Sequence, residues 1–139
     1  DISNISLKEL LFQYNEFLTG GKTKYDETTN TIEGDLLLDS LFDYDTTEYS
    51  KIYLQTLPKC LKGITIDGSF SCENMGITSL QNFPKIITGY CDVTDNPIKS
   101  LVGSPEKIGW SFICKNTKIK STYGICPNIG GNIKLERNI

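Results

Sequence analysis

The sequence predicts a mainly β fold, a solenoid with one helix at its N-terminus, and three observations support this prediction. The first is a repeated template, Ile-x-Gly-x-Φ-x-Φ with Φ an apolar residue, which begins at Ile66, Ile87, Ile108 and Ile129. Successive starts are 21 residues apart, and a fixed period in the twenties is typical of solenoids, in which each repeat forms one coil. The second is composition, because the chain lacks alanine and is rich in Ile, Thr and Asn, which favours strands and turns. The third is a helical spacing of apolar residues near the N-terminus.

The length predicts a single domain over residues 1–139. Within it we expect a capping helix over residues 1–21 and a repeat array over residues 32–139 with an insertion at residues 39–51. Ser6 and Glu9 form a capping box at the start of the helix, and Gly20-Gly21 ends it. The helix should cover the open apolar side of the first coil. Its apolar stripe contains Leu7, Leu10, Leu11, Tyr14 and Leu18, widened by Phe12 and Phe17.

The repeat array should contain about five coils, because Ile32 begins a further copy of the template. Each coil is expected to have a short strand, a turn at Asn or Asp, an apolar Ile and an irregular return that contains Pro. Asn and Asp suit such turns because their side chains bond nearby backbone and tolerate left-handed dihedral angles. The expected turn residues are Asn74, Asp95-Asn96, Asn116 and Asn138.

The first coil is longer than the others, because 34 residues separate Ile32 from Ile66. The inserted segment is acidic and aromatic, and loops on rigid scaffolds often carry function. It is therefore either a surface loop or a recognition loop. The recognition loop would use Phe42, Asp43, Tyr44 and Asp45.

Strand parity predicts which side chains point away from the core, because the two Φ positions point inward. The expected outward set is Asp35 and Leu37; Ser69, Ser71 and Glu73; Tyr90, Asp92 and Thr94; Ser111, Ile113 and Lys115; Asn132, Lys134 and Glu136. Tyr90 and Ile113 are apolar among polar neighbours such as Asp92 and Lys115, as in a small interface hot spot. The alternative is an incidental pair of exposed side chains.

Trp110 departs from the template, because it occupies the position held by Gly68, Gly89 and Gly131. In one interpretation the glycine role moves to Gly109, and a bulge turns Trp110 outward toward a partner. In the other, which the sequence alone leads us to favour, Trp110 fills a gap in the core.

Residues of common catalytic and metal sites are missing or unsuitably spaced. The chain has no histidine, and its five cysteines form no Cys-x-x-Cys pair, which argues against a proton shuttle and a zinc site. We therefore expect a non-enzyme without cofactor or metal. Cys72, Cys91 and Cys114 fall on inward strand positions, and unpaired buried thiols suit a reducing compartment such as the cytoplasm.

Charge is divided unequally along the chain. Residues 1–50 carry three Lys or Arg and eleven Asp or Glu, whereas residues 51–139 carry eleven and six. This suits an acidic cap on a mildly basic array, or two different partner surfaces. A basic cluster of Lys99, Lys115, Lys118 and Lys120 has no interleaved aromatic residues, so nucleic-acid binding is not expected. No apolar run reaches the ~20 residues of a membrane helix, so a membrane partner is not expected either.

Further residues recur around the template. They are Leu57-Pro58-Lys59-Cys60-Leu61 before a strand, Gly68 through Asn74 within it, and Ile77-Thr78-Ser79-Leu80 after it. This order resembles that of leucine-rich-repeat-like proteins encoded by tailed bacteriophages. The resemblance implies a curved solenoid with a parallel sheet on its concave face, and binding rather than catalysis.

The function expected from this resemblance is to bind a host or phage protein through the concave sheet or the insertion, with inhibition of a host system as one form of it. The alternative is a structural, virion-associated module that assembles with copies of itself. The sequence ends soon after the template that begins at Ile129, which would leave the edge of the last coil open to a second copy, as in a homodimer. The expected location is the host cytoplasm or the virion.

Overall fold

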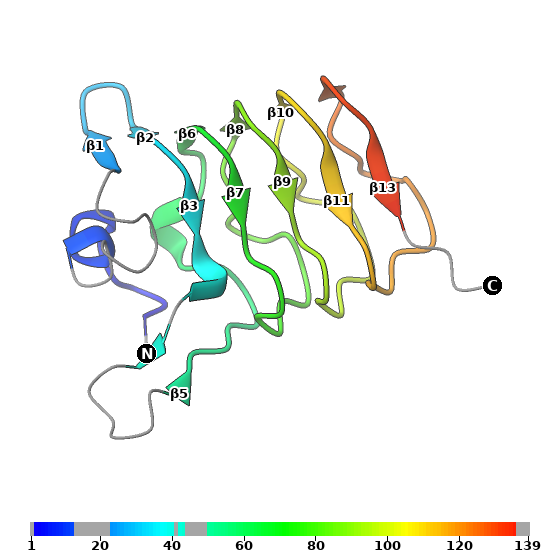
Figure 1. The fold of residues 1–139 in the computed structure, drawn as a ribbon, viewed down its shortest axis with the longest axis horizontal. Coiled ribbons are helices and arrows are strands. Elements are labelled where there is room, and N and C mark those ends of the chain that lie inside the picture. The colour runs from blue at the N-terminus through cyan, green and yellow to red at the C-terminus, as the bar shows by residue number, and fades with distance from the viewer. Residues whose placement is uncertain (1, 13–22, 41, 44–49, 136–139) are drawn as a thin grey trace.

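The computed structural model describes residues 2–12, 23–40, 42–43 and 50–135. The chain forms a mainly β structure with one short N-terminal helix, followed by a parallel β-solenoid of about three turns with a 21-residue period (Figure 1). Two parallel sheets run along the stack of coils, where the repeats had predicted one. The regular steps of 21 residues from Ile66 to Ile129 make about three turns rather than the five coils expected, and the longer first step contributes further strands to both sheets.

The first sheet, sheet A, has the strand order β1-β2-β6-β8-β10-β12, and only its β1–β2 pair is antiparallel. Its register aligns Ile32, Ile66, Ile87, Ile108 and Ile129, which are the first residues of the template. The strands are β1 (Lys24–Asp26), β2 (Thr31–Glu33), β6 (Thr65–Asp67), β8 (Ile86–Ile87), β10 (Lys107–Ile108) and β12 (Asn128–Ile129).

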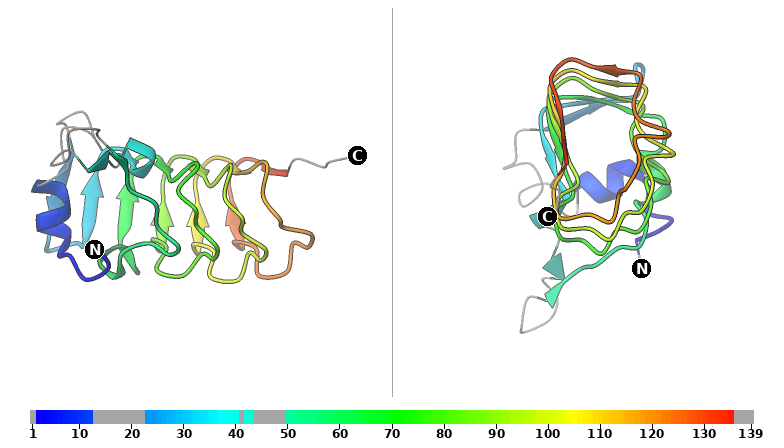
Figure 2. Two further views of the ribbon diagram at one scale, coloured as in Figure 1. Left: turned by 90° about the horizontal axis from the view of Figure 1, so that it is seen from below. Right: turned by 90° about the vertical axis from the view of Figure 1, so that its right-hand side faces the viewer.

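The second sheet, sheet B, contains the Φ positions of the template and has the order β13-β11-β9-β7-β3, all parallel. The strands are β3 (Leu36–Leu37), β7 (Phe70–Ser71), β9 (Cys91–Asp92), β11 (Phe112–Cys114) and β13 (Ile133–Leu135). A view along the stack shows the coils superposed as one closed outline, with the helix across its far end (Figure 2).

Turns and returns connect sheet B to sheet A of the next coil. Asn74, Asp95 and Asn116 have φ angles of 52°, 62° and 50°, in the left-handed region that Asn and Asp tolerate. These three turns were predicted from the sequence. Asn138 lies outside the described residues.

The helix covers the first coil. Residues 7–12 are helical, and the Glu9 N–H donates to Ser6 Oγ at 3.1 Å, as the capping box predicts. Leu7, Leu10 and Leu11 are buried in the core. Phe12 was expected to widen this apolar stripe, but it is 91% exposed. Phe12 is rotated by about 100° from Leu11 around the helix axis, so its side chain points away from the buried side of the helix. Tyr14, Phe17 and Leu18 lie outside the described residues.

The long step from β3 to β6 contains the inserted segment. It includes two 3₁₀ turns, η1 (Leu38–Ser40) and η2 (Lys59–Leu61), and an antiparallel pair of strands, β4 (Phe42–Asp43) and β5 (Ser50–Lys51). The β4–β5 pair projects from the side of the solenoid (Figure 2). In the described part of the chain, no helix has the length and apolar character needed to cross a membrane.

Candidate interaction surface

The outer face of sheet B carries most of the residues that the sequence singled out. Phe70, Cys91 and Phe112 point into the core, and their chain neighbours on alternate positions point outward. Parallel register arranges the outward residues in three rows across the strands. The middle row is Leu37, Ser71, Asp92, Ile113 and Lys134. The second row lies two residues earlier along each strand and contains Asp35, Ser69, Tyr90, Ser111 and Asn132. The third row lies two residues later and contains Asp39, Glu73, Thr94 and Lys115.

The three rows change in charge along the solenoid. Asp35, Asp39, Glu73 and Asp92 lie on or beside β3, β7 and β9, whereas Lys115 and Lys134 lie on or beside β11 and β13. Between them, Tyr90 immediately precedes β9 and is diagonal to Ile113 on the adjacent strand β11, and both are half-buried. The structure thus brings together Tyr90, Asp92, Ile113 and Lys115, which the sequence had grouped.

The row that begins at Asp35 also connects successive coils. The Ser69 N–H donates to Asp35 Oδ1 at 2.8 Å, and the Tyr90 N–H donates to Ser69 Oγ at 3.1 Å. The Asn132 N–H donates to Ser111 Oγ at 3.3 Å. Ser69 was predicted as a surface residue, but it is buried because it forms this bridge between coils.

Ser71 was also predicted to be accessible, and it is only 3% exposed. It lies between Leu37 and Asp92 in register, and its Oγ has no hydrogen-bond partner. Two more buried oxygens in the next row, Asp39 Oδ1 and Thr94 Oγ1, also have none. We call Asp39, Ser71, Glu73, Asp92 and Thr94 the Glu73 cluster.

The two carboxyl groups at the centre of this cluster interact directly. The carboxyl group of Asp92 is close to that of Glu73, and both its charge and a hydrogen bond to the protonated form favour a proton on Glu73. Burial raises the pKa of the Glu73 carboxyl, and the negative charges of Asp92, Asp39 and Asp95 raise it further. Burial, followed by the charge of Asp35, also raises the pKa of the Tyr90 hydroxyl. This part of the surface therefore carries a concentrated negative potential.

Sequence reasoning did not foresee the pairing of Glu73 with Asp92. The signal was present, because Ser71 and Asp92 are 21 residues apart and Glu73 lies two residues further along the same strand direction. Glu73 is therefore diagonal to Asp92 on the outer face, within reach of a long side chain. Asp39 joins them because the 34-residue first step puts it in the row of Glu73.

Trp110 is 65% exposed and does not fill the core gap that we favoured from the sequence. The physical reason is the close approach of the coils at Gly109, where a Cβ would lie 2.0 Å from the Thr88 carbonyl oxygen. Gly109 approaches the preceding coil closely, and Trp110 points into solvent at the corner before sheet B. The outward direction of Trp110 agrees with the other interpretation, whereas its bulge and its contact with a partner stay predictions.

The predicted recognition loop is described only at its ends. Phe42 and Asp43 form β4. Tyr44 and Asp45 lie outside the described residues.

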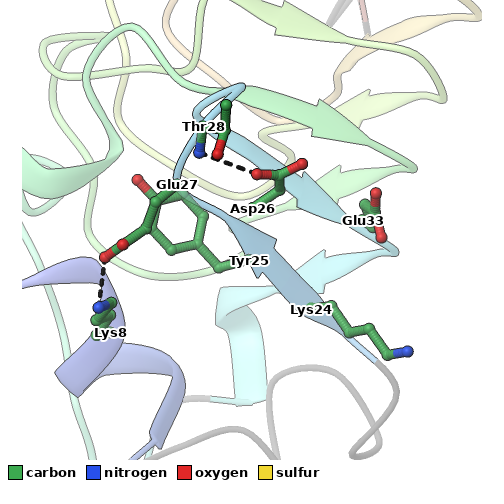
Figure 3. A pocket seen from close by; sticks show the side chains of 7 residues that line it. All are labelled: Lys8, Lys24, Tyr25, Asp26, Glu27, Thr28 and Glu33. Carbon is green, nitrogen blue, oxygen red and sulfur yellow. Dashed lines mark hydrogen bonds and ion pairs between the residues drawn. The ribbon is translucent and has the colours of Figure 1, made fainter.

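Two of the hollows away from sheet B are lined by several charged side chains. The first, of about 550 Å³, lies between the helix and the β1–β2 hairpin (Figure 3). Its charges compensate one another, because Lys8 pairs with Glu27 at 2.5 Å and Asp26 Oδ1 accepts the Thr28 N–H at 2.9 Å. The hydrogen bond and charge of Glu27 raise the pKa of Lys8. These contacts tie the helix to the first coil. The remaining lining residues are Lys24, Tyr25 and Glu33.

The second hollow, of about 540 Å³, lies on the return side of the coils and is lined by Lys99, Thr117, Lys118 and Lys120. It contains three of the four lysines that the sequence grouped, and Lys115 is not among its lining residues. All three lysines are exposed.

The cysteines behave as the sequence predicted. All five are unpaired, and Cys72, Cys91, Cys114 and Cys126 are buried. Burial raises the pKa of the Cys114 thiol to about 12, which makes it a poor nucleophile at neutral pH. Among the described residues, no three His, Cys, Asp or Glu side chains are arranged to hold a metal ion.

Comparisons of the chain with protein-family models, with curated proteins and with solved structures find no match.

Proposed function

We propose that the chain is a non-catalytic, protein-binding solenoid that acts on a host or phage protein through the outer face of sheet B. The observation that supports this most is the diagonal pair of half-buried apolar residues, Tyr90 and Ile113, between groups of opposite charge. Apolar anchors with a charged surround are typical of interface hot spots. The coils beneath hold them on a rigid scaffold, which lowers the entropy lost on binding.

The same proposal includes a more specific type of solenoid and a more specific class of partner. The resemblance to phage-encoded leucine-rich-repeat-like proteins supports a leucine-rich-repeat-like solenoid in which sheet B is the concave sheet. The partner would then be a protein of the infected cell or of the phage, met in the host cytoplasm or in the virion. Inhibition of a host system is the form of activity that this origin favours.

A binding experiment with paired variants tests the proposal. The immobilised protein is incubated with host-cell extract, and the captured proteins are identified and quantified by mass spectrometry. The double variant Tyr90→Ala/Ile113→Ala should lose a specific partner, and deletion of residues 40–50 tests the contribution of the insertion. Ile86→Ala is the matched control, because Ile86 is also half-buried but lies on sheet A. Equal capture by both altered forms and the control would refute binding through either surface.

The alternative function, self-assembly as a structural module, is favoured by a separate observation at the last coil. Ile129, Ile133 and Leu135 are only partly buried, whereas Ile108, Phe112 and Cys114 at the same positions one coil earlier are fully buried. Stacking against a second copy would bury this apolar edge. Sedimentation at increasing concentration should then show a rise in mass that Ile133→Lys removes. A constant monomer mass would exclude this alternative.

A further inference from the structure

The Glu73 cluster combines uncompensated negative charge with buried oxygens that lack partners. Its three carboxyl groups belong to Asp39, Glu73 and Asp92. The ion pairs among the described residues, Lys8–Glu27 and Lys85–Glu106, lie elsewhere. Like charges at such proximity repel, and together with burial this repulsion raises the pKa of the Glu73 carboxyl. An external cation would relieve the repulsion.

The unpartnered oxygens are an independent indication of a ligand. Ser71 is 3% exposed and its Oγ has no partner, although buried polar atoms in proteins are nearly always hydrogen-bonded. Phe70 and Cys72 point into the core, so the Ser71 side chain lies on the outer face, in the position beside its register neighbour Asp92. Asp39 Oδ1 and Thr94 Oγ1 are also buried and also lack a hydrogen-bond partner. Asp39 Oδ1 can only accept hydrogen bonds when ionised, whereas the two hydroxyls can both donate and accept, so a cationic donor from outside could bond to all three oxygens.

A lysine or arginine head group has the complementary properties. Lysine brings three donors and arginine five, each with a full positive charge and no acceptor. A bare metal ion suits the cluster less well, because the described carboxylates are not arranged as a metal-binding set. Lys115 on this face is diagonal to Asp92 and two strands away from Glu73, and it forms no ion pair with a carboxylate among the described residues.

The neighbouring residues define the rest of the ligand. Ile113 is next to Asp92 in the same row, about 5 Å away across the strands. Tyr90 lies on the same strand as Asp92, two positions earlier, and an aromatic ring face also attracts a cation. In an extended segment, residues are about 3.3 Å apart, so a basic residue and an apolar residue two positions apart would span both sites.

We propose that the Glu73 cluster receives a lysine or arginine side chain of a partner protein, while an apolar residue two positions away in the same extended segment contacts Tyr90 and Ile113. This inference rests on the proposed function, because it names the kind of partner segment that the outer face of sheet B binds. In this arrangement the Glu73 cluster at one end of the surface attracts the basic side chain, and Tyr90 and Ile113 at its centre contact the apolar one.

The test uses synthetic peptides and the full chain, with backbone amide shifts measured by NMR. The probe is the acetylated and amidated peptide Gly-Lys-Gly-Leu-Gly, titrated to millimolar concentration, with a second peptide in which glutamate replaces lysine. The lysine peptide should shift amides of β7, β9 and β11, and its affinity should fall as salt is added. The glutamate peptide should not bind. Absence of shifts with the lysine peptide, or shifts centred on other elements, would overturn the inference.

Matched variants locate the site. Glu73→Gln/Asp92→Asn keeps the shapes of the side chains and removes their charge, and should weaken the lysine peptide at least about fivefold, as expected for loss of a charge-assisted contact. Glu106→Gln, an exposed carboxylate on the return to sheet A, should leave the affinity unchanged. Equal affinity for all three proteins would refute a role for the cluster.

Two further measurements separate other occupants. Calcium chloride that shifts the same amides more strongly than the peptide would assign the cluster to a metal ion and overturn the proposal. A concentration-dependent mass that Glu73→Gln/Asp92→Asn abolishes would assign it to a second copy of the chain, with the same consequence. In the extract experiment, loss of partner by Tyr90→Ala/Ile113→Ala but not by Glu73→Gln/Asp92→Asn would preserve the proposed function and reject this inference.

Discussion

The closed coils and the last described coil have the same register and similar residues, yet their burial differs. Phe70, Cys91, Phe112 and Ile133 form one inward row of sheet B. The first three are completely buried, whereas Ile133 is only partly buried. The difference is that the first three have a coil on both sides. Burial in this fold is therefore supplied by the next coil rather than by the coil to which a residue belongs.

The first coil supports the same conclusion from the other end. There the helix takes the place of a preceding coil, and Leu10 belongs to the same core cluster as Ile32 and Leu36, with all three fully buried. The outer face shows a related trend: Ser71 is covered, whereas Lys134 in the same row is exposed. Matched substitutions at equivalent positions should measure this difference directly.

The largest effect is expected from truncation of the inward row. Phe112→Ala should lower the free energy of unfolding by about 3–5 kcal/mol, because it removes a fully buried ring between two coils. Ile133→Ala, in the same row of the open coil, should cost about 1 kcal/mol, since part of its surface is already in water. Urea unfolding gives both values. Equal losses would show that the last coil is closed in solution.

A large effect is also expected at Asn96, whose buried side chain connects two coils. Its Oδ1 accepts the N–H groups of Met75 (2.9 Å) and Ile77 (3.0 Å), and its Nδ2 donates to Cys72 O at 2.8 Å. Asn96→Ala leaves these groups buried and unpaired, and should cost about 3 kcal/mol.

Thr117 provides the control for Asn96, because it is 21 residues later and its hydroxyl makes one bond, to Cys114 O at 3.0 Å. Thr117→Ala should cost about 1 kcal/mol or less. Thermal unfolding of both variants tests the pair. A loss at Thr117 as large as that at Asn96 would contradict the role assigned to the buried amide.

A smaller effect is expected from adding a methyl group where coils approach closely. At Gly89, a Cβ would lie 2.9 Å from the carbonyl carbon and oxygen of Gly68. Gly89→Ala should cost about 1–3 kcal/mol, because the backbone on both sides is fixed by neighbouring coils. Gly131→Ala creates a similar contact, 2.9 Å from the Trp110 carbonyl carbon, but the last coil has room to shift. Its smaller loss, read from the same unfolding curves, would confirm the contrast.

The smallest effect concerns pH and the covered part of the outer face. Because burial and Asp92 raise the pKa of Glu73 above its usual 4.5, the folded state holds that proton more tightly than the unfolded state. The contribution of Glu73 is therefore fully present below pH 4.5 and is lost as pH rises through the raised pKa. Glu73→Gln should lose less stability than the natural chain over this range. If the free energy of unfolding changed with pH in the same way for both proteins, this role of Glu73 would be contradicted.

The sequence predicted the features that repeat and missed those that depend on contacts between unlike segments. The step from Ile66 to Ile129 determined the register of both sheets, and the turns at Asn74 and Asn116 followed from side-chain chemistry. Sheet A was missed because the template Ile-x-Gly-x-Φ-x-Φ was interpreted as one strand. In the structure its Ile lies in sheet A and its Φ residues lie in sheet B, with the Gly position between the two strands.

Side-chain burial at single positions was harder to predict. Trp110 was expected in the core because tryptophan is usually well buried, but its position was decided by how closely Gly109 approaches Thr88. The burial of Ser71 depends on neighbours from three coils, and Asp39 joins them only through the long first step. The members of the candidate surface could be named from parity, whereas the pairing of Glu73 with Asp92 required the register in three dimensions.

The constant period has a consequence for the length of this molecule. Deletion of residues 87–107 would join Ile86 to Ile108 and bring β10 into the place of β8, so that every later residue keeps its side of the chain. A deletion one residue shorter would exchange inward and outward positions throughout the remainder. Gain or loss of whole turns is thus the change in size that this architecture tolerates, and it would bring lysines such as Lys115 one step nearer to the carboxylates of the first coils without altering either group.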